Sequence, residues 1–187
     1  MYLKKLIFAS LLFLGLLQAQ NSIALNINND DLEVQASVNL NTYADYSDST
    51  TYILDASYLH TDGDDLFALG LSGENTFQGL EGLALGFGAK LVFTDDFIAL
   101  PLYGKASYRL PFNDSIPSTS LAASLAYAPS VLTFSDGESY TEFRVEANME
   151  VIQNIHLFAG YRNIDTEYKN YDKTFNDSFY GGMKLSF

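Results

Sequence analysis

The sequence has no cysteine and no tryptophan, and basic residues are scarce. Without cysteine no disulfide framework can hold an exported fold together, so another device must do so, and a sheet closed on itself is one. Ten lysines and arginines stand against 23 aspartates and glutamates, which gives a formal net charge of −13. This charge argues against nucleic acid and anionic phosphate surfaces as partners. With 187 residues, the chain is long enough for one domain and too short for two well-cored ones.

Long apolar runs are missing too, apart from one at the amino end. Lys4 and Lys5 precede a mainly apolar run at residues 6–17, which Gln18, Ala19 and Gln20 follow. This run is shorter than the roughly 20 residues that a membrane-spanning helix needs. A basic start, a short apolar middle and a small residue before a polar segment predict a signal peptide over residues 1–19. We therefore expect an exported chain whose mature domain comprises residues 20–187.

The rest of the sequence is dominated by strict alternation of apolar and polar residues. In residues 139–151 the odd positions from Phe143 onward are apolar, and the even positions from Glu142 onward are polar or charged. Successive side chains of a strand point to opposite faces, so this stretch predicts a strand with one apolar and one ionic face. A soluble sheet would bury the apolar face in a core, whereas an outer-membrane barrel would turn it to lipid.

Alternating runs separated by Asp, Asn, Ser, Gly and Pro clusters predict an all-β chain of about ten strands. The expected strands cover residues 22–27, 32–40, 52–59, 66–74, 82–93, 97–110, 121–127, 139–151, 155–164 and 177–187. Since single-chain bacterial barrels have even strand numbers, the weak first run is kept, and eight strands is the alternative. The predicted fold is an antiparallel up-and-down transmembrane β-barrel in the outer membrane. A soluble periplasmic β-sandwich that binds a ligand is the competing interpretation.

The carboxyl end favours the barrel. The chain ends on Phe187, with Leu185 two residues before it and Gly182 five before it. These residues resemble the carboxyl-terminal insertion signal of outer-membrane barrels, which implies recognition by the barrel assembly machinery through strand addition. A soluble terminus is usually polar and frayed, so a final strand that ends on a bare Phe supports the same conclusion.

A longer resemblance covers most of the mature chain. Residues 136–168, with S-Y-T-E at the start, E-A-N in the strand and G-Y-R-N-I near the close, resemble a hairpin of the YfaZ family of Gram-negative outer-membrane proteins. Looser similarity runs through G-L-A-L-G-F-G-A-K at residues 82–90 and on to the end. The resemblance implies a porin-like barrel topology without an established activity, and it carries no catalytic residues to this chain.

With the polar faces turned inward, the expected lumen contains as many acids as bases. The acids are Glu33, Asp55, Glu74, Glu142, Glu146 and Glu150, and the bases are Lys90, Lys105, Arg109, Arg144, Arg162 and Lys184. An unpaired buried charge costs several kcal/mol. A balanced set therefore predicts a structural barrel or narrow channel whose lumen is closed by salt bridges. The predicted ionic network consists of Glu142, Arg144, Glu146, Glu150 and Arg162, joined by Lys105 and Arg109.

Catalytic and metal-binding motifs are absent from the sequence. There is no G-x-S-x-G, no P-loop and no zinc motif, so we expect no enzyme activity, no cofactor and no metal. His60, Asp62, Asp64 and Asp65 could form a rim site like that of outer-membrane proteases, and a rim enzyme is therefore the second alternative. The expected partners are outer-membrane lipid, lipopolysaccharide and the barrel assembly machinery. We expect a monomer that binds no nucleic acid.

Overall fold

The computed structural model describes residues 21–43, 49–95, 97–111, 117–169 and 171–187. The predicted signal peptide lies outside these residues. Within these described residues there are two short 3₁₀ helices, η1 (Leu40–Thr42) and η2 (Ser130–Leu132), and twelve strands. The strands are β1 (Ser22–Ile27), β2 (Asp31–Asn39), β3 (Thr51–Thr61), β4 (Asp64–Thr76), β5 (Leu83–Phe93), β6 (Phe97–Ala99), β7 (Leu102–Arg109), β8 (Thr119–Ala128), β9 (Thr133–Ser135), β10 (Gly137–Ile152), β11 (Ile155–Tyr168) and β12 (Asp172–Ser186).

The twelve strands form a barrel wall of ten, because β6 with β7 and β8 with β9 each make one interrupted wall strand. β6 and β7 both pair with β5 in one antiparallel register and are separated only at Leu100 and Pro101. Proline has no N–H to give to the ladder, which explains the interruption. β9 likewise continues β8 after the bulge made by η2, and pairs with β6 where β8 pairs with β7. The predicted strand over residues 97–110 is therefore interrupted, and the predicted loop after residue 127 contains β9.

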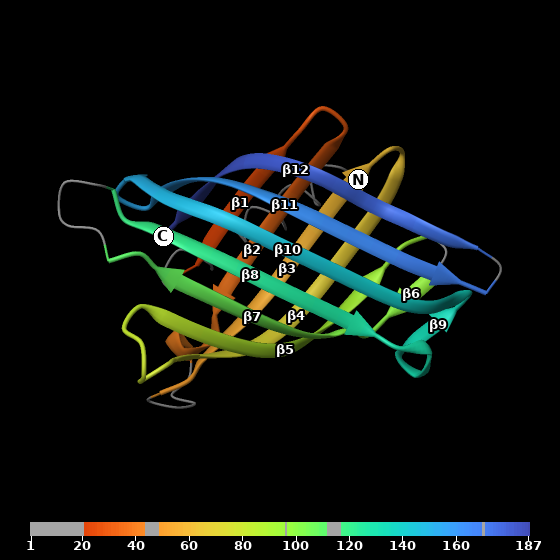
Figure 1. Ribbon diagram of the computed structural model, residues 1–187, viewed down its shortest axis with the longest axis horizontal. Coiled ribbons are helices and arrows are strands. Elements are labelled where there is room, and N and C mark those ends of the chain that lie inside the picture. Colours follow the sequence, from red (N-terminus) through yellow and green to blue (C-terminus); the bar gives the residue numbers. More distant parts are fainter. Residues whose placement is uncertain (1–20, 44–48, 96, 112–116, 170) are drawn as a thin grey trace, which may run out of the picture.

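The sheet closes into a barrel (Figure 1). Each wall strand pairs antiparallel with its neighbours, and β1 pairs with β12 from Ser22↔Ser186 to Ile27↔Gly181. Beyond this seam, Asn21 and Phe187 exchange backbone hydrogen bonds of 3.0 and 2.9 Å. The ten-strand antiparallel barrel is confirmed, while the eight-strand count and the β-sandwich are wrong.

The two ends of the barrel differ in shape. We call the end with Asn21 and Phe187 the terminal end, and the opposite end, where residues 28–30 and 62–63 turn the chain, the far end. β10, β11 and β12 are 16, 14 and 15 residues long and extend the wall at the far end. They include most of residues 165–176, which the sequence pattern predicts as a loop.

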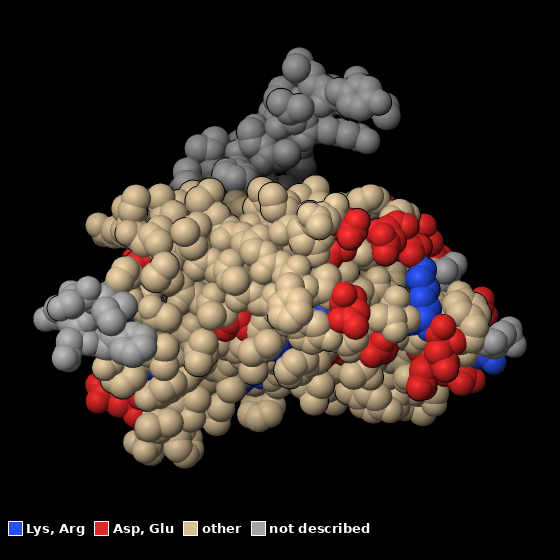
Figure 2. Space-filling model, turned by 45° about the horizontal axis from the view of Figure 1, so that its top comes forward, with Lys and Arg blue, Asp and Glu red and all other residues tan. Residues whose placement is uncertain are grey.

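The far end is also acidic on its outside (Figure 2). Acidic side chains gather toward that end of the visible face, where two lysines are near them. Lys169 lies 3.7 Å from Asp136, and Lys173 lies 2.5 Å from Asp64. The exposed acids of the extended wall are Asp136, Glu138, Asp165, Glu167, Asp172 and Asp177.

The apolar and polar faces are inverted relative to a soluble protein. Phe143, Val145 and Met149 leave 41, 40 and 38% of their surface exposed on the outside of the barrel, while Glu142 keeps 9% and Arg162 none. Similar outward apolar side chains occur on the other wall strands, for example Tyr58 on β3 and Leu157 on β11. No helix among the described residues is long and apolar enough to cross a membrane. A closed barrel with an apolar exterior and a buried ionic interior is a membrane-embedded barrel.

Candidate functional site: a lumen closed at one end

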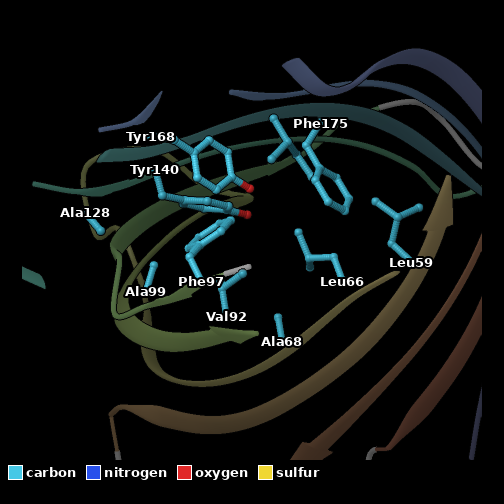
Figure 3. Packing of buried hydrophobic residues seen from close by; sticks show 11 residues of the cluster. Leu59, Leu66, Ala68, Val92, Phe97, Ala99, Ala128, Tyr140, Tyr168 and Phe175 are labelled. Atoms are coloured by element: carbon cyan, nitrogen blue, oxygen red, sulfur yellow. The ribbon is translucent and has the colours of Figure 1, made fainter. Parts of the chain in front are cut away.

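The lumen at the far end is filled by an apolar cluster, which we call the apolar plug (Figure 3). The ring of Phe97 meets that of Tyr168 edge-on at 5.5 Å and lies 6.2 Å from that of Tyr140. Its buried members are Leu59, Leu66, Ala68, Val92, Phe97, Ala99, Ala128, Tyr140, Ile164, Tyr168 and Phe175. They come from β3, β4, β5, β6, β8, β10, β11 and β12, so side chains from opposite parts of the wall pack together inside the lumen.

Below the plug lies an ionic layer centred on Glu33. Arg144 Nη2 is 2.7 Å from Glu33 Oε1, and Arg162 Nη1 is 2.5 Å from Glu33 Oε2. Asn26 donates a further hydrogen bond of 2.7 Å to the same carboxylate. Arg144 and Arg162 occupy opposite positions of β10 and β11, where like charges would repel each other. Glu33 removes this repulsion by binding both guanidinium groups.

An aromatic ring supports the same two arginines. The guanidinium carbons of Arg144 and Arg162 lie 5.5 and 5.4 Å from the centre of the Tyr180 ring, within cation–π range. Gly160 stands opposite Tyr180 in the β11–β12 pairing, and a Cβ there would lie 2.7 Å from that ring. The glycine therefore leaves the space that the ring occupies.

Two further carboxylates complete the ionic layer. Asp31 is 3.4 Å from Arg162 Nη2 and accepts hydrogen bonds of 2.6 Å from Ser178 and 2.9 Å from Asn176. Glu142 is 2.5 Å from Lys90 Nζ and also accepts the hydroxyl of Tyr140, which ties the layer to the plug. The layer thus contains three carboxylates (Asp31, Glu33, Glu142) and three cations (Lys90, Arg144, Arg162). Buried charges of this kind persist only when paired, and these are.

The structure divides the predicted ionic network between this layer and the rest of the lumen. It brings Glu142 within 4.0 Å of Arg144 and places Arg162 beside both. Lys105 pairs instead with Glu74, in space left by Gly86. The remaining three members are Glu146, Glu150 and Arg109. Glu146 accepts hydrogen bonds from Asn148 and Tyr180, Glu150 accepts one from the Asn154 backbone, and Arg109 has no ion pair among the described residues.

The residues of the predicted insertion signal lie along the β1–β12 seam. Gly182 pairs with Asn26, and a Cβ on it would lie 2.3 Å from the Leu25 carbonyl oxygen and 2.5 Å from the Phe158 ring. Leu185 points outward with 47% of its surface exposed. Phe187 exchanges its backbone hydrogen bonds with Asn21. In the folded barrel these residues therefore help to close the wall.

Cavities occupy the lumen from the ionic layer toward the terminal end. Their volumes are about 230, 400 and 490 Å³, and we number them first, second and third in that order. Glu33 and Arg144 line the first, and Glu150 and His156 line the third. The first two share Lys105 and Ser124, and the last two share Ser107 and Ser120, so the cavities follow one another along the lumen.

Two of the predicted rim residues, His60 and Asp65, lie on the outside of the wall. His60 Nδ1 is 2.7 Å from Asp65 Oδ1, and Tyr58 donates a hydrogen bond of 2.8 Å to the same oxygen. The side chains of His60 and Asp65 are 48 and 54% exposed, and Asp64 pairs with Lys173. Asp62 occupies the turn with a positive φ of 48°. The His60–Asp65 pair therefore faces the surroundings of the barrel and not the lumen.

The sequence pattern missed the apolar plug and Asp31. Alternation assigns large apolar residues to the outside, so inward Phe97, Tyr140 and Tyr168 run against the rule. Their signal is their position in the alternation: on β10, Tyr140 shares the inward parity of Glu142 and Glu146. Asp31 shares the parity of Glu33 in the same way, although the surrounding asparagines predict a turn.

A family match covers this chain almost completely. The sequence pattern of the family described as YfaZ precursor matches residues 3–187. The chain belongs to the YfaZ family. No curated protein matches it.

Two solved structures resemble this YfaZ-family barrel at low identity. A bacterial polysaccharide outer membrane secretin is 14% identical, with a TM-score of 0.50 over 84% of this chain and 56% of that chain. This chain therefore spans little more than half of the secretin's length. A KdgM porin is 10% identical, with a TM-score of 0.49 over 90% of this chain and 99% of that chain. At such identity a likeness bears on the fold alone.

Proposed function

We propose that this YfaZ-family protein is an integral outer-membrane barrel that is closed at its far end and is not an open diffusion pore. In single-chain bacterial barrels both termini lie on the periplasmic side. The terminal end, with its cavities, would then face the periplasm, and the acidic far end would face outward.

The observation that carries this proposal is the pair of layers across the lumen. The apolar plug brings together buried side chains from eight of the strands, and the ionic layer beneath it leaves no exposed surface on Arg162 and little on Glu33. Small barrels of eight to ten strands hold side chains inside, whereas aqueous channels occur in barrels of about 16 strands. A solute would have to displace both layers in order to pass.

An enzymatic role is the weaker candidate. The nearest approach to a catalytic arrangement in the described residues is the His60–Asp65 contact of 2.7 Å. Both side chains are about half exposed on the outside of the wall, and so is Tyr58, whose hydroxyl shares the same Asp65 oxygen; a catalytic site usually holds its groups in a pocket instead. We therefore propose a structural, non-enzymatic role.

We further propose that the barrel is a monomer surrounded by outer-membrane lipid and lipopolysaccharide. Its apolar exterior would face the acyl chains, as in other barrels of this class. Gly182, Leu185 and Phe187 lie on the strand that closes the wall, which supports their recognition by the barrel assembly machinery before closure.

Planar-bilayer recording on the refolded protein tests the closed lumen. The expected result is no steady conductance. A Phe97→Ala, Tyr168→Ala double variant removes two rings that meet at 5.5 Å and is expected to show openings. Steady conductance of the unaltered protein would contradict the proposal and favour a narrow channel for small solutes or ions.

A further inference from the structure

We propose that the second cavity binds a small zwitterion, a molecule that carries both an ammonium and a carboxylate group, which enters from the terminal end. The inference rests on the proposed function, because the closed far half makes the cavity a dead end rather than a passage. A volume of about 400 Å³ lies within the range of small-molecule sites, which is roughly 300–1,000 Å³.

The first observation is a buried amide oxygen without a partner. Asn148 lines the second cavity and keeps 7% of its surface exposed. Its Nδ2 donates a hydrogen bond of 2.7 Å to Glu146 Oε1, which fixes the orientation of the amide. Its Oδ1 has no hydrogen-bond partner among the described residues. Leaving a buried acceptor unsatisfied costs about 1–3 kcal/mol. The oxygen has less than 1 Å² of accessible surface, so a donor in the cavity reaches it when the side chain turns toward the cavity.

The second observation is the charge that remains in the cavity once internal pairs are removed. Five charged side chains line it: Glu74, Lys105, Arg144, Glu146 and Lys184. Lys105 is paired with Glu74, and Arg144 is paired with Glu33. One carboxylate and one ammonium are left, those of Glu146 and Lys184. Neither has an oppositely charged group within 4.0 Å in the part of the chain that the structure describes.

These two observations specify the ligand's chemistry. A ligand ammonium can donate to Glu146, and also to the free Oδ1 of Asn148 once that side chain turns toward the cavity; both residues lie on the same side of β10. A ligand carboxylate can accept from Lys184. The rest of the wall is made of small residues, among them Ser107, Ser120 and Ala122, which leave room for the ligand and offer hydroxyl groups. A ligand with a single charge would leave one of the two protein charges without a partner.

Isothermal titration of the refolded barrel in detergent micelles tests the inference, with glycylglycine as the probe. We expect saturable binding at one site, and no binding of uncharged N-acetylglycinamide or of glucose. Asn148→Leu and Lys184→Met should each weaken glycylglycine binding by about tenfold or more, the loss expected for one charged or buried hydrogen bond. Lys169→Met is the matched control, because it removes a lysine at the far rim, outside the lumen, and should leave the affinity unchanged.

Several outcomes would overturn the inference. Equal affinity for N-acetylglycinamide or glucose would show that charge pairing does not select the ligand. Unchanged affinity in Lys184→Met would show that the Lys184 ammonium does not bind the ligand carboxylate. The result is separable from the proposed function. Steady conductance of a barrel that binds glycylglycine contradicts only the closed lumen. Absence of both conductance and glycylglycine binding contradicts only this site.

Discussion

The far half and the terminal half of the lumen are built on the same strands and filled in different ways. On β10, Tyr140 and Glu142 in the far half are buried in the plug and the ionic layer. Glu146 and Glu150, four and eight residues beyond Glu142 on the same face, line cavities. The comparison teaches that alternation decides which side chains point inward, while their size and pairing decide whether the lumen is closed.

Side-chain size explains much of the difference. In the far half, large inward residues such as Phe97, Tyr168 and Arg162 reach across the barrel. In the terminal half, β5, β7 and β8 contribute mainly small inward residues: Ala84, Gly86, Ser107, Ser120, Ala122 and Ser124. These side chains are too short to reach one another across the lumen, so cavities remain between them. Some charged groups there, such as Glu146 and Lys184, have no ion pair among the described residues.

The largest effect on stability is expected from Glu33→Gln. The substitution keeps the shape of the side chain but leaves Arg144 and Arg162 opposite each other without the carboxylate between them. Breaking a buried ion pair costs about 3–5 kcal/mol, and we expect a loss of this size in the free energy of unfolding by urea.

Glu150→Gln is the control in the terminal half, because Glu150 lines a cavity and accepts one hydrogen bond, from the Asn154 backbone. Its expected change is within about 0.5 kcal/mol, as for substitutions away from tight packing. Equal losses in the two variants would erase the distinction between the halves.

A smaller effect is expected from Gly160→Ala, which tests the packing beneath the arginines. The new Cβ would lie 2.6 Å from the Val145 carbonyl oxygen and 2.7 Å from the Tyr180 ring. Overpacking of this kind costs about 1–3 kcal/mol, again measured as the free energy of unfolding.

Gly181→Ala on the neighbouring strand is the matched control. Its Cβ would meet only the Phe158 carbonyl oxygen, at 3.7 Å. We expect no loss, and even a gain of up to about 1 kcal/mol, because alanine has less conformational freedom to lose on folding. If both variants lost the same stability, tight packing around Tyr180 would not be the cause.

The sequence was sufficient to predict the wall. Strict alternation predicted the strands and their two faces, including the outward positions of Phe143, Val145 and Met149. The partners inside the lumen could not be predicted, because Glu33 and Arg162 are 129 residues apart and meet only once the seam closes. The far ends of β11 and β12 were missed because their Asp, Asn and Thr residues are typical of loops, while pairing with a neighbouring strand holds them in the sheet.

The central claim, a dry far half and a hydrated terminal half, is tested most directly by thiol labelling. The chain has no cysteine of its own, so a single substitution reports on one place. Ala99 on β6 is fully buried in the plug, and Ala122 on β8 lines the second cavity. With a small charged thiol reagent, we predict that the Ala122→Cys variant is modified and the Ala99→Cys variant is not. Modification of both at similar rates in the folded barrel would contradict the account.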